Sequence, residues 1–214
     1  FGRTDTERIQ ISEKTITNPN QYNNEGNSIG GLNNFSETYI DFGHEFSNVE
    51  NYSRYLNLYT AVSGVEYTYD DVTYTREYFT SYPDKALVIR LDADTSGALS
   101  FTLRPTIPFE QDYIEEGDGK SKHGTVTSMV EDGIGQIELS GKMGYYDIDF
   151  LGLYKVYIDG GEMYADTTEH SYKDTAGITH KDEDGTIVVE GATSAYIVVT
   201  LGTDYELSSE MFTN

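Results

Sequence analysis

The stretch that decides the fold runs from Tyr52 to Asp94 and reads YSRYLNLYTAVSGVEYTYDDVTYTREYFTSYPDKALVIRLDAD. Apolar or aromatic residues alternate with polar ones through most of it, and this is the period of a β-strand with one buried face. Asp70-Asp71 and Ser81–Asp84 have the composition of tight turns. Ala86–Leu91 is almost continuously apolar, which favours a position inside a sheet. The block therefore predicts several consecutive strands joined by short turns.

The same period continues on both sides of this block, and helical periodicity is almost absent. Strands are expected at Arg8–Ser12, Thr38–Phe42, Leu56–Val62, Val65–Tyr69, Leu99–Leu103, Gly124–Glu131, Gln136–Ser140, Asp149–Ile158, Glu162–Asp166, Thr186–Glu190 and Ala195–Leu201. Gly64 is expected to mark a bulge or bend, and Ala195–Leu201 is expected to close the sheet. Loops are expected at Asn18–Asn34, Gln111–Lys122 and Asp174–Asp184.

About a dozen short strands with frequent turns predict an all-β fold, a sandwich of two antiparallel sheets. The length of 214 residues fits one large all-β domain, and no linker divides it. The 19 tyrosines and 9 phenylalanines supply large apolar areas for a core. The first residue is Phe1, inside a strand-forming region, so we expect an excised piece of a longer protein.

Charge and composition exclude several classes of function. The net charge is −23 and the isoelectric point is near 4.2, so nucleic acid and anionic membrane surfaces are poor partners. The chain has no cysteine, which excludes disulfides, thiolate zinc sites and thiol catalysis. No apolar run is long enough to span a bilayer, and no signal peptide is visible.

The block Tyr52–Asp94 resembles the N-terminal domain of glycoside hydrolase family 95, the α-L-fucosidase-type enzymes. The matching positions are Tyr52, Arg54, Leu56, Leu58, Thr60, Ala61, Val62, Val65, Tyr67, Val72, Tyr74, Arg76, Glu77, Phe79, Ser81, Pro83, Asp84, Val88, Arg90 and Leu91. Further similar stretches are Glu7–Glu13, Asp159–Gly161, Val189–Ala192 and Thr203–Tyr205, so the resemblance covers nearly the whole chain. It departs after Glu13, where the family has a Thr-Leu-Trp-Ser-Gly run and this chain has Lys14–Asn18 and no tryptophan.

The resemblance implies a β-supersandwich of the galactose-mutarotase-like kind over residues 1–214, followed in the parent by an (α/α)6 barrel that carries the catalytic residues. This chain ends at Asn214, before such a barrel could begin. We therefore expect a non-catalytic N-terminal domain that supports and shapes the cleft of its own downstream catalytic domain. The parent would act on fucosylated or related glycans, and would be bacterial and extracellular, cell-surface or cytoplasmic.

Candidate sites are weaker signals than the fold. Adjacent carboxylates such as Glu115-Glu116 and Asp182–Asp184 fit loop chemistry first, and a structural calcium ion second. We expect no cofactor and no catalytic residue in this piece. The four histidines have no spacing typical of a metal site. For substrate contact the sequence favours Asn18, Asn20, Tyr22, Tyr145 and Tyr146.

Two alternatives stay open. The first is a free-standing carbohydrate-binding or adhesion module, with Tyr52, Tyr55 or Tyr59 lining a sugar-binding face beside Tyr145-Tyr146. The second is a mutarotase-like epimerase with a histidine and a glutamate as acid and base. The strand arginines Arg54, Arg76 and Arg90 are expected to pair with acids such as Glu77, or to stack on tyrosine rings.

Overall fold

The computed structural model describes residues 34–108, 110, 122–144, 148–166, 170–173, 179–182 and 185–205. The chain divides into two units, Phe1–Asn34 and Phe35–Asn214, and the described residues after Asn34 all belong to the second. In these residues the backbone forms fourteen β-strands and one short 3-10 helix, Phe46–Asn48. The all-β class expected from the sequence is confirmed.

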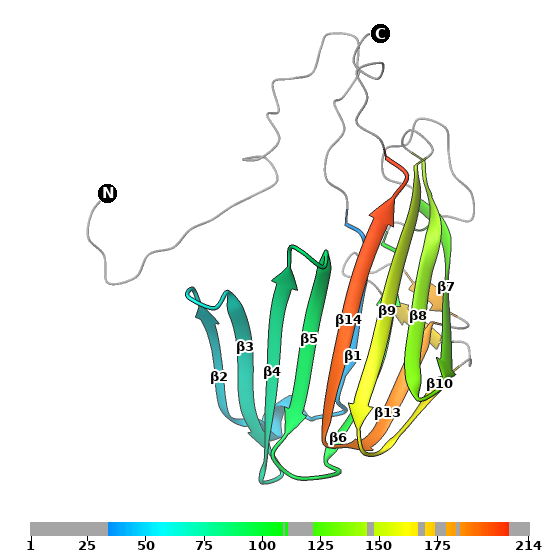
Figure 1. Ribbon diagram of the computed structural model, residues 1–214. Helices are drawn as coiled ribbons and strands as arrows, with labels where there is room; N and C mark the ends of the chain where they lie inside the picture. Colours follow the sequence, from blue (N-terminus) through cyan, green and yellow to red (C-terminus); the bar gives the residue numbers. More distant parts are fainter. Residues whose placement is uncertain are drawn as a thin grey trace. The chain divides into compact units, whose positions relative to one another are not determined.

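Twelve of the strands form two antiparallel sheets that face each other (Figure 1). The larger sheet has the order β2 (Glu50–Asn57), β3 (Val62–Tyr69), β4 (Val72–Ser81), β5 (Ala86–Ala93), β14 (Ser194–Thr203), β9 (Asp149–Asp159), β8 (Ile134–Met143), β7 (Lys122–Glu131). The smaller sheet has the order β1 (Glu37–Asp41), β6 (Leu99–Thr106), β13 (Thr186–Ala192), β10 (Glu162–Asp166). β11 (His170–Lys173) and β12 (Thr179–Asp182) pair with each other as a separate two-stranded antiparallel sheet.

The predicted hairpin at Asp70-Asp71 is confirmed. These residues join β3 to β4 with φ angles of 49° and 61°, the left-handed conformation that a two-residue type I′ turn requires. Aspartate tolerates this conformation better than most residues other than glycine. Asp132-Gly133 joins β7 to β8 in the same way, with φ angles of 52° and 77°.

The core lies between the two sheets and comes from alternate residues of the central strands. Its fully buried members include Leu91, Leu99, Leu103, Ile137, Leu139, Val156, Ile187, Ala195 and Ile197. Buried Tyr154 of β9 bonds to the hydroxyls of Thr38 at 2.8 Å and Ser36 at 3.2 Å, which satisfies its polar end inside the sandwich. These two bonds link β9 of the large sheet to the start of the small sheet at β1.

The structure corrects five details of the expected strands. A turn interrupts Leu56–Val62, because β2 ends at Asn57 and accepts hydrogen bonds there from the Tyr59 and Thr60 amides. Gly64 lies inside β3 rather than at a bend. Lys122 belongs to β7, not to a loop, and β12 lies within the expected loop Asp174–Asp184.

The fifth correction concerns β14, which joins two halves of the large sheet instead of closing it. β14 pairs with β5 on one side and with β9 on the other. Its sequence SAYIVVTLGT is apolar on the inner face, as a central strand requires. The expected strand Arg8–Ser12 and the loop Asn18–Asn34 up to residue 33 lie outside the described residues.

Candidate functional site

The five residues favoured for substrate contact are Asn18, Asn20, Tyr22, Tyr145 and Tyr146. All five lie outside the described residues, so their role stays a prediction. The other tyrosines proposed for a sugar-binding face, Tyr52, Tyr55 and Tyr59, are described and exposed. Of these, Tyr55 joins a larger arrangement on the sheet.

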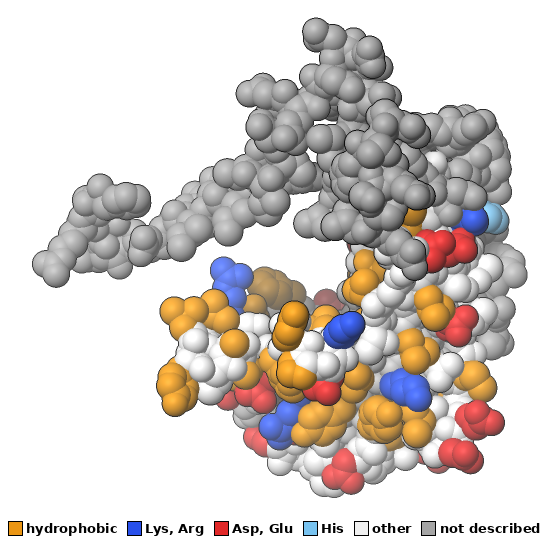
Figure 2. Space-filling view, turned by 45° about the horizontal axis from the view of Figure 1, so that its top comes forward, with side chains coloured by type: hydrophobic (Ala, Val, Ile, Leu, Met, Phe, Trp, Pro, Cys, Tyr) orange, Lys and Arg blue, Asp and Glu red, His pale blue; other side chains and the backbone are white. Residues whose placement is uncertain are grey.

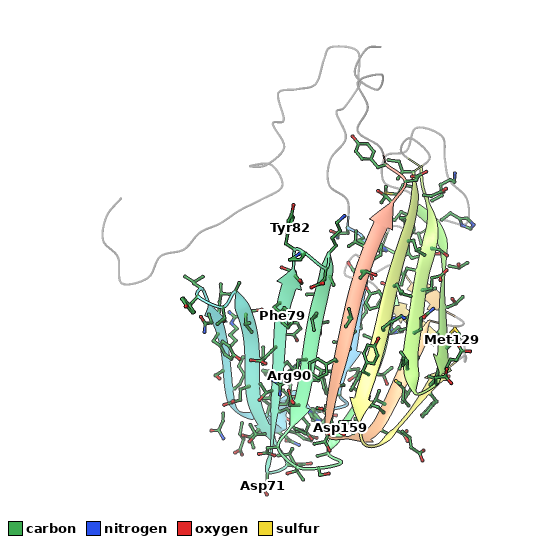
Figure 3. The ribbon with its side chains drawn as sticks, in the orientation of Figure 1. Asp71, Phe79, Tyr82, Arg90, Met129 and Asp159 are labelled. Carbon is green, nitrogen blue, oxygen red and sulfur yellow. The ribbon has the colours of Figure 1, made fainter. Side chains whose placement is uncertain are left out.

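One row of side chains crosses the outer face of the eight-stranded sheet, the face turned away from the small sheet. Cross-strand partners link Tyr55 to Gly64, Gly64 to Glu77, Glu77 to Arg90, Arg90 to Tyr196 and Tyr196 to Tyr157. Directly opposed residues point to the same face of a sheet. We call Tyr55, Glu77, Arg90, Tyr196 and Tyr157 the outer row; Figure 3 labels Arg90 near the middle of this face.

Arg90 organises the polar part of the outer row. Its Nε lies 2.8 Å from Asp92 Oδ2, and its Nη2 donates to Asp92 Oδ1 at 3.0 Å. Nη1 reaches Glu77 Oε2 at 3.5 Å. The hydrogen bond with Asp92 is the main cause of a raised pKa for Arg90. The predicted pairing of Arg90 with Glu77 is confirmed, and the paired acids hold the guanidinium in one orientation.

Aromatic rings complete the row at both ends. The ring of Tyr55 lies over Gly64, where a side chain would collide with it, and its hydroxyl donates to Glu77 Oε1 at 3.1 Å. At the other end the Arg90 guanidinium carbon lies 5.9 Å from the centroid of the Tyr196 ring. Tyr196 and its neighbour Tyr157 are 43% and 40% exposed. The row thus offers exposed rings beside fixed hydrogen-bonding groups.

A second aromatic group surrounds His44 near the end of β1. His44 stacks on Tyr69 at a centroid distance of 4.1 Å, and its Nδ1 lies 3.0 Å from the Tyr67 hydroxyl. Burial, followed by the positive charge of Arg76, lowers the pKa of His44. Arg76 itself lies over the rings of Phe42 and Tyr67, as the sequence predicted for a strand arginine. These contacts hold His44 among aromatic rings, and the charged groups that act on it are Arg76, Asp70 and Asp41.

Two other kinds of feature are absent from the described residues. Within the described ranges, no three acidic or histidine side chains come together as metal ligands would. The same residues contain no helix with the length and apolar character needed to cross a membrane. The acidic runs considered for calcium lie outside this part, or are described in backbone only.

Comparison with protein families gives a match over most of the chain. The family described as "Glycosyl hydrolase family 65, N-terminal domain" matches residues 18–208. The chain belongs to this family. It is therefore an N-terminal domain of a glycoside hydrolase, as the resemblance implied, and the finer assignment to family 95 stays a prediction.

Two individual relatives of this N-terminal domain have larger chains. A stretch of 64 residues, 30% of this chain, is 38% identical to "Alpha-L-fucosidase 2" of Arabidopsis thaliana and covers 8% of that protein. Among solved structures, "Putative kojibiose phosphorylase from human microbiome" aligns with 73% of this chain and 20% of its own, at 10% identity and a TM-score of 0.42. The domain thus spans a small part of the length of both proteins.

The sequence alone did not reveal the outer row of this N-terminal domain. Tyr157 and Tyr196 lie on different strands and meet only because β9 pairs with β14 in one particular register. Alternation identifies which residues share a face of one strand, but it does not give the pairing of distant strands. The Arg90–Asp92 pair could have been predicted from the sequence, because residues two apart on a strand share a face.

Proposed function

We propose that this chain is the non-catalytic N-terminal domain of an α-L-fucosidase-like hydrolase of the family 95 type. It packs against a downstream (α/α)6 catalytic barrel and shapes the cleft in which fucosylated or related glycans are cleaved. The observation that carries the proposal is the 38% identity over 64 residues to "Alpha-L-fucosidase 2". The family match over residues 18–208 supports the role of an N-terminal domain.

The side chains of the described residues support a non-catalytic role. A glycosidase needs two carboxyl groups on either side of the scissile bond, one of them free to donate a proton. Glu77 of the outer row and the adjacent Asp92 accept from the same guanidinium, that of Arg90. This arrangement favours positioning and binding over proton transfer.

The test compares the parent protein with this chain alone. The parent is expected to release fucose from 2′-fucosyllactose, and the 214-residue chain to release none at equal molar concentration. Release of galactose from lactose by the same preparations is the control for contaminating glycosidases. Fucose release by the isolated chain, or a parent that lacks a helical domain after Asn214, would contradict the proposal.

A second candidate function is a carbohydrate-binding module that works without the barrel. The outer row favours it, because Tyr157 and Tyr196 are exposed in the same row as Arg90 and its two acids. Tyrosine rings offer an apolar face that suits the C–H surface of a sugar, and charged groups bond to its hydroxyls.

Titration calorimetry of the isolated chain with 2′-fucosyllactose and with xyloglucan oligosaccharides tests this candidate. If the row binds sugar, Tyr157→Ala and Tyr196→Ala each weaken binding at least tenfold. Tyr164→Ala is the matched control, because Tyr164 of β10 is 44% exposed but lies on the small sheet, where it donates to Glu190. No heat with either sugar, or equal loss in all three variants, removes the candidate.

A further inference from the structure

The eight-stranded sheet extends beyond the small sheet at its β2 edge. Contacts between the sheets run from β10 and β13 to β7 and β8, and from β6 to β5. Every residue of β2 is exposed, whereas β5 and β14 alternate with buried positions. Figure 1 likewise draws the small sheet behind β14, β9 and β8, and none of its strands behind β2. Strands of the small sheet therefore leave the inner face of β2 and β3 uncovered over part of its length.

A groove lies on this uncovered part, and we call it the overhang groove. Its volume is about 370 Å³, and it is lined by Arg54, Tyr55, Leu56, Ser63, Gly64, Val65 and Tyr78. Leu56 is 63% exposed, and the adjoining turn adds exposed Leu58 and Tyr59. Figure 2 shows hydrophobic side chains gathered at this edge of the molecule. Contiguous exposed apolar side chains of this kind mark a surface that another protein element covers.

The charge of the groove is opposite to that of the chain. Arg54 and Arg76 flank Val65 on the inner face, because both are its cross-strand partners. Arg54 forms no ion pair with a carboxylate among the described residues, whereas the guanidinium of Arg76 packs over Phe42 and Tyr67. The nearby acids Glu66 and Glu77 alternate with Val65 and Arg76 and so belong to the outer face. In a chain of net charge −23, this local positive surface suits a carboxylate from a partner.

We propose that the overhang groove is the docking site for the downstream catalytic domain of the parent, which fills it with an apolar segment carrying a carboxylate. The inference rests on the proposed function, since it takes the partner to be the rest of the same hydrolase. Leu56 and Val65 beside Arg54 match an apolar side chain with an adjacent acid. A second copy of this chain fits less well, because two chains of charge −23 repel each other.

Hydrogen–deuterium exchange of the full-length parent and of this chain alone tests the proposal. In the parent, amides of residues 52–65 are expected to exchange at least tenfold more slowly than in the isolated chain. Amides of β7 (Lys122–Glu131), the opposite edge of the same sheet, are the internal control and exchange alike in both proteins. Equal exchange of residues 52–65 in both proteins overturns the proposal. Protection that appears in the isolated chain as its concentration rises also overturns it, in favour of a second copy.

Charge variants in the parent identify the groove itself. Leu56→Asp and Arg54→Glu are each expected to abolish the slow exchange of residues 52–65. Leu201→Asp is the matched control, because Leu201 is 60% exposed at the far end of β14, outside the groove. In the isolated chain both groove variants should unfold at the wild-type temperature, because the altered side chains are exposed there. Slow exchange that survives both groove variants would place the interface elsewhere.

The two proposals fail separately. A parent that releases fucose while residues 52–65 exchange freely keeps its function and loses the docking site. A parent in which these residues are protected but no fucose is released keeps the docking site and loses the assigned substrate. Wild-type fucose release in Leu201→Asp, together with reduced release in Leu56→Asp, would show that docking at the groove shapes the cleft.

Discussion

At the scale of single residues, several strands touch so closely that only glycine fits. Gly124 of β7 and Gly141 of β8 are direct cross-strand partners. A Cβ on Gly141 would lie 2.6 Å from the Gly124 Cα and 2.8 Å from Phe150 Cζ, and it would also collide with the carbonyl oxygen of His123. Most of these atoms belong to backbone, which cannot rotate away.

Gly141→Ala is therefore expected to lower the free energy of unfolding by about 1–3 kcal/mol, the usual cost of overpacking. Gly202→Ala is the control, because nothing lies within 4 Å of a Cβ built there, and it should change stability by less than about 0.5 kcal/mol. Urea unfolding followed by tyrosine fluorescence measures both. Equal stability of the two variants would contradict the steric argument.

Lys122 at the start of β7 is a buried lysine. Its side chain is 2% exposed, and burial lowers the pKa of its ammonium group to about 8. In the unfolded chain this pKa is about 10.4. Between these two values the unfolded chain binds more protons at Lys122 than the folded one, so this group makes folding more favourable as pH rises.

We expect the unfolding free energy of the wild type, relative to that of Lys122→Met, to increase as pH rises from 7 to 9.5. The increase should reach up to about 1.4 kcal/mol per pH unit above pH 8. The prediction concerns the difference in unfolding free energy between the two proteins, because tyrosine ionisation at high pH changes the stability of both. Guanidinium unfolding at four pH values gives the comparison. Parallel pH profiles would show that the ammonium is solvated in the folded protein.

At the scale of elements, β14 holds the large sheet together. It pairs with β5 over Ser194–Thr200 and with β9 over Ser194–Thr203, and so connects the β2–β5 hairpins to the β7–β9 meander. Ile197 is fully buried between the sheets at the middle of this strand. Loss of packing there affects both halves of the sheet at once.

Ile197→Ala is expected to lower the free energy of unfolding by about 2–5 kcal/mol, from lost burial and the cavity left behind. Leu201→Ala lies four residues along the same strand, at an exposed position, and should cost less than about 0.5 kcal/mol. Guanidinium unfolding measured by far-ultraviolet circular dichroism compares the two. A small loss in the Ile197 variant would mean that the two halves fold independently of β14.

At the scale of the whole molecule, the net charge of −23 makes the folded chain repel itself. Salt screens such repulsion over distances greater than the Debye length. Raising sodium chloride from 0.02 M to 0.5 M at pH 7.5 should therefore raise Tm by about 2–4 °C, the shift that roughly 1 kcal/mol produces in a domain of this size. Near pH 4.5, close to the isoelectric point, the same salt should change Tm much less. A salt response that is equal at both pH values would exclude self-repulsion as its cause.

The amino-acid sequence by itself determined the all-β class, most strand positions and the Asp70-Asp71 hairpin, because alternation and turn chemistry are local properties. It also carried the resemblance that led to the family of N-terminal domains. Only the tertiary structure decided that β14 lies between β5 and β9, that Tyr157 meets Tyr196, and that the β2 edge reaches past the small sheet. These features depend on the pairing of strands far apart in the chain, and a period of two along one strand does not specify its neighbours. Local rules therefore predict most strands and turns of Tyr52–Asp94, and packing decides which surfaces the sheet presents.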